Sequence, residues 1–384
     1  MQYKEITLDE LGVRIELAAF TPPQGKVAEW HAMLHVEPRN ETFQQQYHRL
    51  CKAEAQFMAD ESMAEAQTVL KRYFLSDSTN QQPLMEQTTA CTVSYIQQPP
   101  LDGSKIALWL YLQRGTQVTH QADQLGSTIV RNNGYEHIWT MGMSTSQGDS
   151  YQQTQTLLEN YETLLEQHNA TIQDHCIRTW FFVRDVDTQY HGLVAARRNN
   201  FNQHGLTAQT HYIASTGIGG NPSNTKALIQ MGCYTLKGFQ PQQQQQYLYA
   251  HTHLNRTSDY GVTFERGTLL KFGDRNHAYI SGTASINNKG EVVHIGNIEK
   301  QTQRMWENVE TLLQEANMTM ADTAQIIVYL RDNADYNTVS QMFRQKYPNV
   351  PTVFTLAPVC RPTWLIEMEC IAIRTATNNT FNNF

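Results

Sequence analysis

Two glutamates that could exchange protons stand near the end of the chain, in the stretch WLIEMECIAI (364–373). Successive side chains of a strand point to opposite faces, so Glu367 and Glu369 would share one face about 7 Å apart. Trp364, Leu365 and Ile366 precede Glu367, and burial beside such residues raises the pKa of a carboxyl group. Glu367 is therefore a candidate general acid and Glu369 its supporting partner. The alternative is that both carboxylates face water on a half-exposed strand.

Two arginines lie where they could bind a carboxylate. Arg361 stands in a turn after a strand-like run, and Arg266 stands just before another. A guanidinium group can hold a carboxylate with two parallel hydrogen bonds. Either arginine could instead form a surface salt bridge. Arg178 and Arg197 are weaker candidates, because the pattern AARRNNF (195–201) predicts a solvated helix face.

Small residues gather in the run ISGTAS (280–285), directly after a strand-like stretch. Such a run forms either a plain turn or a floor low enough for a ligand to approach the backbone. A second glycine-rich run, YIASTGIGG (212–220), lacks the phosphate-binding motifs GxGxxG and GKS/T, so nucleotide binding is not predicted. Cys360 has no evident histidine partner in the sequence and is expected to be a packed thiol. We predict neither a metal site nor an organic cofactor.

The composition excludes several classes of protein. The chain has 384 residues, enough for two or three domains. Its net charge of −7 argues against a nucleic-acid partner, which needs clustered lysine and arginine. Six scattered cysteines without a CxxC pair indicate free thiols. The first residues lack the apolar core of a signal peptide and no stretch is long enough to span a membrane, so we expect a cytoplasmic protein.

An internal repeat predicts the architecture. Residues 153–174 and 301–322 align without gaps and share 12 of 22 residues. Both copies place apolar residues at helical spacing, and a short β-rich run ending in Arg-Asp follows each copy. A second helix and further strands come next. Each unit therefore predicts an α+β fold, a mixed β-sheet with two helices packed on one face.

Two such units are expected in tandem. The first covers residues 1–240 with its repeated core near 124–240, and the second covers 265–375 and carries the site. Residues 241–264, which are glutamine-rich at their start, predict a linker. Residues 1–120 contain helical pattern near 28–70 and two strand-like runs, and they are expected to complete or extend the first sheet. Residues 376–384 are expected to be a frayed polar tail.

This order of elements, with the paired LRD or VRD motif and the closing IEMECIAI, resembles the Rid family of reactive intermediate deaminases, once called L-PSP endoribonucleases. The resemblance implies a trimer with clefts between subunits and an arginine in a Pro-x-Arg motif that holds the substrate carboxylate. Valine stands at that position in PTV (351–353), and TAQ (207–209) is the matching stretch of the first unit. The deaminase arginine is therefore missing from both.

A narrower resemblance is to the chorismatases, a branch that fuses two Rid-like units. It rests on five stretches in order: RTW (178–180), ASTGIGG (214–220), LNRTSDYGVTFERG (254–267), YISGTAS (279–285) and VCRPTWLIEME (359–369). The resemblance implies that Glu367 is the general acid and that Arg361 and Arg266 bind carboxylates. It further implies a pocket containing Tyr212, Thr216 and Cys360, with a floor of Thr283, Ala284 and Ser285.

The function expected from these residues is cleavage of the enolpyruvyl ether of chorismate, or of a related carboxylated metabolite, with release of pyruvate. Carboxylates require fixed cations, and a vinyl carbon requires a strong acid to protonate it. Whether the ring product is a dihydrodiol or a hydroxybenzoate stays open. The alternatives are a non-catalytic Rid-like protein that binds a small metabolite, and an imine deaminase. We expect a homo-oligomer, with a trimer as one form.

Overall fold

The computed structural model describes residues 1–23, 26–86, 90–121 and 125–384. The first 114 residues form a six-stranded sheet of their own rather than an extension of the next one. Its strand order is β1-β2-β3-β6-β4-β5, with β4 and β5 parallel and the other neighbours antiparallel. Its elements are β1 (Gln2–Leu8), β2 (Val13–Phe20), β3 (Ala28–Val36), α1 (Phe43–Met58), β4 (Gln67–Leu75), α2 (Ser78–Gln81), β5 (Thr92–Gln97) and β6 (Ile106–Arg114).

The second sheet contains the first copy of the sequence repeat. Its strand order is β7-β8-β9-β12-β10-β11. The expected start of the repeat, near residue 124, lies outside the described residues. The elements are β7 (Gln117–His120), β8 (Thr128–Asn132), β9 (Tyr135–Ser144), α3 (Ser150–Gln167), α4 (Ile172–His175), β10 (Cys176–Val183), α5 (Val186–Gln203), β11 (Ala214–Gly219) and β12 (Ile229–Lys237).

The third sheet contains the second copy, in the order β13-β14-β15-β18-β16-β17. Part of the expected linker, residues 245–248, is its edge strand and pairs with β14. The elements are α6 (Pro241–Gln244), β13 (Gln245–Leu248), β14 (Gly267–Lys271), β15 (Arg275–Ala284), α7 (Ile298–Glu315), β16 (Thr323–Leu330), α8 (Tyr336–Lys346), β17 (Thr352–Leu356) and β18 (Ile366–Thr375).

The three sheets are copies of one topology, because adding six to each strand number of the first sheet gives the second, and adding six again gives the third. The prediction of repeated α+β units with mixed sheets is confirmed, and the repeat extends to a third unit. We call residues 1–114, 117–237 and 241–375 the first, second and third units. The helical pattern near 28–70 was only partly right, since α1 is flanked by β3 and β4. In β3, Glu29, His31 and His35 alternate with apolar residues, which is the period of a strand.

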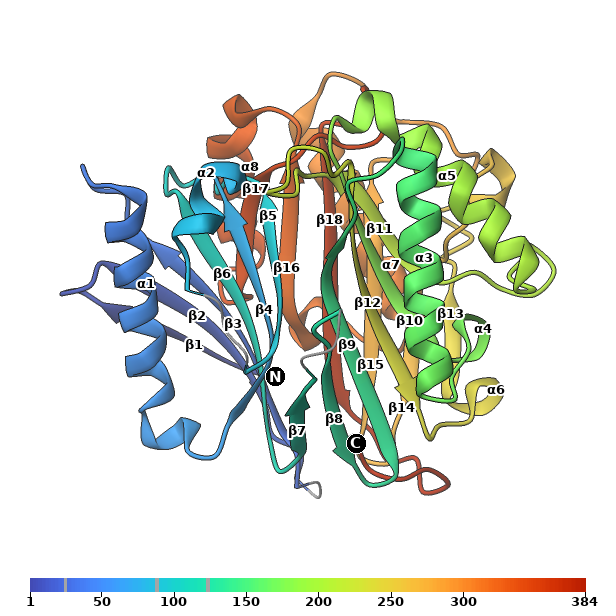
Figure 1. Ribbon diagram of the computed structural model, residues 1–384, viewed down its shortest axis with the longest axis horizontal. Helices are drawn as coiled ribbons and strands as arrows, with labels where there is room; N and C mark the ends of the chain where they lie inside the picture. The colour runs from blue at the N-terminus through green and yellow to red at the C-terminus, as the bar shows by residue number, and fades with distance from the viewer. Residues whose placement is uncertain (24–25, 87–89, 122–124) are drawn as a thin grey trace.

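The units form a closed ring, with one isolated backbone bridge at each seam. Gln97 pairs with Asn221, Ala214 with Glu265, and Thr355 with Pro100. The larger helices lie outside the sheets, with α1 beyond the first sheet and α3 and α5 beyond the second (Figure 1). Each unit thus places the edge of its β5, β11 or β17 strand against the next unit.

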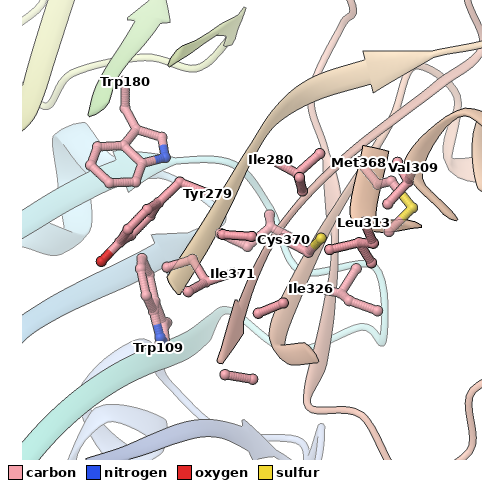
Figure 2. Close-up of a cluster of buried hydrophobic side chains, with 14 of the residues drawn as sticks. Trp109, Trp180, Tyr279, Ile280, Val309, Leu313, Ile326, Met368, Cys370 and Ile371 are labelled. Carbon is pink, nitrogen blue, oxygen red and sulfur yellow. The ribbon is translucent and has the colours of Figure 1, made fainter. Parts of the chain in front are cut away.

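The third unit shows how the sheet separates its two faces. Met368 and Cys370 of β18 point toward α7, where Leu313 packs (Figure 2). Side chains alternate along a strand, so Glu367 and Glu369 point to the opposite face, into the ring. The same face carries Tyr279, which Figure 2 shows near Trp109 and Trp180 of the other units.

The C-terminal tail is packed rather than frayed. Phe384 is 2% exposed and its ring lies against Phe272, His137 and His277. Asn382 donates a hydrogen bond to the carbonyl of Asn133. The polar composition of the tail predicted solvation, but an aromatic residue at its end anchors it. In the described part of the chain, no helix is long and apolar enough to cross a membrane.

Candidate active site

A cavity of about 450 Å³ opens at the seam between the second and third units. One wall comes from α5 and β11 of the second unit, and the other from β15, β18 and the loop before β18 in the third. Glu367, Arg266, Arg361, Cys360 and Ala284 all line it. Two units therefore build the cavity together, whereas the sequence predicted a site carried by the third unit, with only Tyr212 and Thr216 from the second.

Glu367 lies on the inner wall of this cavity and is 5% exposed. It pairs with Ala284 across β15 and with Tyr329 across β16. Gly282 packs against its carboxyl group so closely that a methyl group there would collide with Oε1. Burial, reinforced by the charge of Glu369, raises the pKa of Glu367 to about 8, against the opposing effect of Arg266 and Arg178. The group is thus protonated at neutral pH and can donate a proton.

Glu369, two residues further along β18, has a different environment. Its Oε2 accepts hydrogen bonds from Arg178 Nη2 at 2.9 Å and from the Thr216 hydroxyl. Its Oε1 accepts one from Trp180 Nε1 at 2.9 Å and lies 3.5 Å from Arg72 Nη1. Donors from within the protein thus engage both carboxylate oxygens of Glu369.

All three units meet at this carboxylate. Arg72 comes from the first, Arg178 from the second and Glu369 from the third, and each side chain is 2% exposed or less. Arg72 also stacks on Trp109 and Trp180, with 5.1 Å to each ring centre. The two glutamates therefore share a face, as predicted, but only Glu367 reaches the cavity.

Four arginines surround the cavity: Arg197, Arg198, Arg266 and Arg361. Arg266 is 4% exposed, donates to the carbonyl and side-chain oxygens of Asn255, and lies over Phe264. Arg361 lies over the Trp364 ring at 4.6 Å and donates to the Gly290 carbonyl. Ring packing and backbone carbonyl groups thus position both guanidinium groups at the cavity wall.

Cys360 lines the cavity with a protonated thiol. Burial raises its pKa to about 12, with a further contribution from Glu367. A thiolate is the reactive form of cysteine, so the Cys360 thiol is an uncharged part of the cavity wall and not a nucleophile.

Four of the expected site residues do not line the cavity: Tyr212, Thr216, Thr283 and Ser285. Thr216 instead bridges Glu369 and the backbone N–H of Gly282. Thr283 donates to the Ser281 carbonyl, and Ser285 to the Val293 carbonyl. Of the expected floor, only Ala284 faces the cavity.

Comparisons with known proteins agree with this architecture. Residues 272–374 match the family model described as Endoribonuclease L-PSP. A RutC family protein of Pyrococcus abyssi is 30% identical over 102 residues, which are 26% of this chain and 80% of that protein. The 3-aminoacrylate deaminase RutC of Acinetobacter baylyi is 28% identical over 99 residues, 25% of this chain and 79% of the relative.

The chain belongs to the Rid superfamily.

A solved structure extends the comparison beyond one Rid unit. A crystal structure of a chorismatase superimposes with a TM-score of 0.62 at 18% identity, covering 80% of this chain and 93% of the chorismatase. The fold is therefore shared with a chorismatase across most of the ring. At this identity the likeness concerns the fold, and the chemistry has to be argued from the site.

The strand register corrects one assignment of the Rid motif. Val183 and Leu330 precede the two Arg-Asp pairs, and they lie opposite Gly219 and Leu356 in the parallel edge strands. Counting back three residues from Gly219 and Leu356 makes Thr216 the counterpart of Val353, in place of the stretch 207–209. The second Rid unit therefore carries a threonine where the deaminase arginine would stand.

The sequence missed the wall contributed by α5. Tyr190, Arg197 and Arg198 line the cavity. Arg197 is 1% exposed and donates to Thr263 and Ser215, so the prediction of a solvated face was wrong for it. The segment that covers Arg197, residues 261–266, follows it by more than sixty positions, and helical periodicity carries no signal of such a contact. Arg178, the other weak candidate, is buried against Glu369.

Proposed function

We propose that this protein is a chorismatase-like enzyme that cleaves the enolpyruvyl ether of chorismate, or of a closely related carboxylated metabolite. The observation that carries the proposal is Glu367, a buried carboxyl group directed into a cavity that four arginines surround. An enol ether needs a proton on carbon, and a dicarboxylate needs fixed cations. The fold shared with a chorismatase supports the assignment.

The proposed reaction begins with transfer of the Glu367 proton to the methylene carbon of the enolpyruvyl group. The ether carbon becomes an oxocarbenium ion, and the new Glu367 carboxylate stabilises it electrostatically. Water adds to this carbon and returns a proton to Glu367. The bond from the resulting hemiketal carbon to the ring oxygen then breaks while the hemiketal hydroxyl loses its proton and the ring oxygen gains one, releasing pyruvate and a dihydroxycyclohexadiene carboxylate.

Each side chain then has a distinct proposed role. Arg266 and Arg361 bind carboxylates, with Arg197 and Arg198 supplying further positive charge from the second unit. Ala284 and Cys360 shape the wall beside the ring. Glu369 and Thr216 support Glu367 from behind, and Tyr212, Thr283 and Ser285 belong to the supporting shell. Light scattering of the purified protein measures whether the expected homo-oligomer forms.

The direct experiment is to incubate the purified protein with chorismate and measure pyruvate and the remaining chorismate. We expect stoichiometric pyruvate release. If chorismate is neither consumed nor converted, the enzymatic proposal fails; if calorimetry then shows saturable chorismate binding, the protein is a metabolite-binding Rid protein. Ammonia released from an imine substrate would support the deaminase alternative, which the missing Pro-x-Arg arginine disfavours.

A further inference from the structure

A second cavity, of about 360 Å³, lies at the seam between the third and first units. Its walls come from α8 and β17 on one side and from β2, β3 and the loop containing Asp102 on the other. These are the same structural elements that build the first cavity, one unit further around the ring. We call the two cavities the first cleft and the second cleft.

Equivalent positions line both clefts. Tyr190 and Arg198 of α5 correspond to Tyr336 and Arg344 of α8 when the two tyrosines are aligned. The register makes Gly219 and Leu356 equivalent positions of the edge strands. Gly217 and Phe354 each lie two residues earlier, so they are equivalent as well. The second cleft is therefore a structural counterpart of the first and not an accidental surface hollow.

Three other counterpart positions carry different side-chain chemistry in the two clefts. The strand registers place Glu16 where the first cleft has Arg266, and His35 where it has Ala284. They place Ala107 where it has Glu367. The general acid and one carboxylate-binding arginine are thus absent from the counterpart positions, so the second cleft cannot repeat the proposed reaction.

The second cleft instead presents both signs of charge. Three carboxylates line it, from Glu5, Glu16 and Asp102, together with Arg14 and Arg344. Arg14 is paired with Glu16 and lies 3.5 Å from Glu5. Arg344 is exposed on α8 and forms no ion pair with the residues that the structure describes.

A buried imidazole stands among the carboxylates. His35 is 8% exposed, with Nε2 3.5 Å from Glu16 Oε2 and Nδ1 3.7 Å from Asp102 Oδ2. Burial lowers the pKa of His35, so the ring is neutral and does not cancel the acidic groups. Among the described residues, Nε2 has no hydrogen-bond partner. His35 lines the second cleft, and an unsatisfied buried polar atom at such a wall calls for a water or a ligand group.

Aromatic rings complete the wall on the side of the third unit. Tyr336, Tyr347 and Phe354 line the cleft, and the rings of Tyr336 and Phe354 are 5.8 Å apart. Burial, reinforced by the charge of Asp102, raises the pKa of the Tyr336 phenol, against the opposing effect of Arg344 and Arg14. An apolar ring flanked by a cation and an anion suits a ligand with the same three features.

We infer that the second cleft binds a free amino acid with an aromatic side chain, whose ammonium group is held at Glu16, Asp102 and His35 and whose carboxylate is held at Arg344. The side-chain ring would lie against Tyr336 and Phe354, where ring contacts add to the apolar burial. The inference does not depend on the proposed reaction, since it uses different residues and a different seam.

Isothermal titration with L-phenylalanine tests the inference, with phenethylamine and 3-phenylpropionate as analogues that each lack one charge. We expect saturable binding of one L-phenylalanine per chain at millimolar concentrations or below. Each analogue should bind about tenfold more weakly, because a charged group that stays unpaired in a partly buried site costs more than 1 kcal/mol. Absence of saturable L-phenylalanine binding, or equal binding of the analogues, overturns the inference.

Matched variants assign the ligand to one cleft. Arg344→Gln should weaken L-phenylalanine about fivefold, as expected for an exposed ion pair, and Asp102→Asn about tenfold. Arg198→Gln, the counterpart in the first cleft, should leave this affinity unchanged. The opposite pattern would place the amino acid in the first cleft and refute the inference. Because Arg344 is exposed, its substitution should not disturb folding, which thermal denaturation checks.

Discussion

The two clefts are built from the same elements, yet one is ringed by arginines around a single carboxyl group and the other mixes three carboxylates with two arginines. The exchange of Arg266 for Glu16 and of Glu367 for Ala107 accounts for much of this difference. Strand order and seam geometry are alike in both. The comparison teaches that the ring supplies a place for a ligand, while a few side chains at fixed register positions decide its charge and chemistry.

The third seam, between the first and second units, shows the limit of this repetition. The first unit has only the short α2 and the 3₁₀ turn 82–84 in the part of the β4–β5 crossover that the structure describes, where the other units have α5 and α8. Gln230, the counterpart of Glu367, donates to the Ser94 hydroxyl at 2.8 Å and is 4% exposed. In the described part of this seam no long helix forms a wall, and the hydrogen bond to Ser94 holds the Gln230 side chain within the protein.

The largest expected effect comes from a substitution that removes the proposed general acid, Glu367, from the first cleft. Glu367→Gln keeps the shape of the side chain but cannot donate the proton, and general acid catalysis contributes about a thousandfold. We expect the turnover number for pyruvate release to fall by this factor with chorismate still binding, as measured by stopped-flow assay and calorimetry. Undiminished turnover would reject Glu367 as the acid while leaving chorismate as the substrate.

Glu369→Gln should act on stability more than on binding. The substitution leaves Arg72 and Arg178 buried without their anion, and breaking a buried ion pair costs about 3–5 kcal/mol. Urea denaturation should show a loss of this size in the free energy of unfolding. Glu367→Gln is the matched control two residues away, and it should be neutral or stabilising near pH 8. Equal losses of unfolding free energy in both variants would mean that an amide destabilises β18 at either position, independently of the ion pairs with Arg72 and Arg178.

Activity and stability should both change with pH as Glu367 loses its proton. Because the pKa of Glu367 is raised from 4.5 to about 8, its proton is available below pH 8, and kcat/KM should fall about tenfold per pH unit above it. The folded state binds this proton more tightly than the unfolded state does. The associated stability is complete below about pH 4.5 and is lost as the pH rises through 8.

Two observations check this dependence. Glu367→Gln should lack that loss of stability between pH 5 and 9, by urea denaturation at each pH. A wild-type rate that stays flat up to pH 10 would contradict a carboxyl acid with this pKa.

The smallest effect should distinguish Arg198 from its counterpart. Arg198→Gln removes a cation from the first cleft and should raise the KM for chorismate about fivefold, since the residue is exposed and solvent screens its charge. Arg344→Gln should leave chorismate cleavage within twofold. Steady-state kinetics of both variants suffices. If Arg344→Gln alone impairs cleavage, the reaction takes place in the second cleft.

The sequence predicted the fold where the repeat is well preserved. The copies at 153–174 and 301–322 keep identical residues, and the structure forms α3 and α7 there, with Leu157, Tyr161, Val309 and Leu313 buried as expected. The first unit escaped notice because the described part of its β4–β5 crossover has only the short α2 and a 3₁₀ turn where the other units have a long helix. In β3, Glu29, His31 and His35 alternate with apolar residues, and this signal of a strand was overlooked within the helical pattern.

The site was predictable mainly where its residues belong to the third unit. Glu367, Cys360 and Arg361 are close in sequence, and they share the first cleft with Arg266 and Ala284. Arg197 and Arg198 come from another unit, so their role depends on how the ring closes. The second cleft carries no repeated sequence motif, since its charged residues come from β1, β2, β3, α8 and a loop.

The ionic centre at Glu369 has a consequence for how such a ring can be assembled. The strand registers make Glu369, Gly232 and Trp109 equivalent, and likewise Ile327, Trp180 and Arg72. A ring of three identical chains would have to repeat one residue at all three places, and three buried glutamates there would repel one another. Joining the units in a single chain removes that constraint, so one carboxylate, one glycine and one indole can share the centre. Because the covalently joined copies differ in sequence, Glu369 can lie beside one of the three seams alone and pair with arginines from the other two copies.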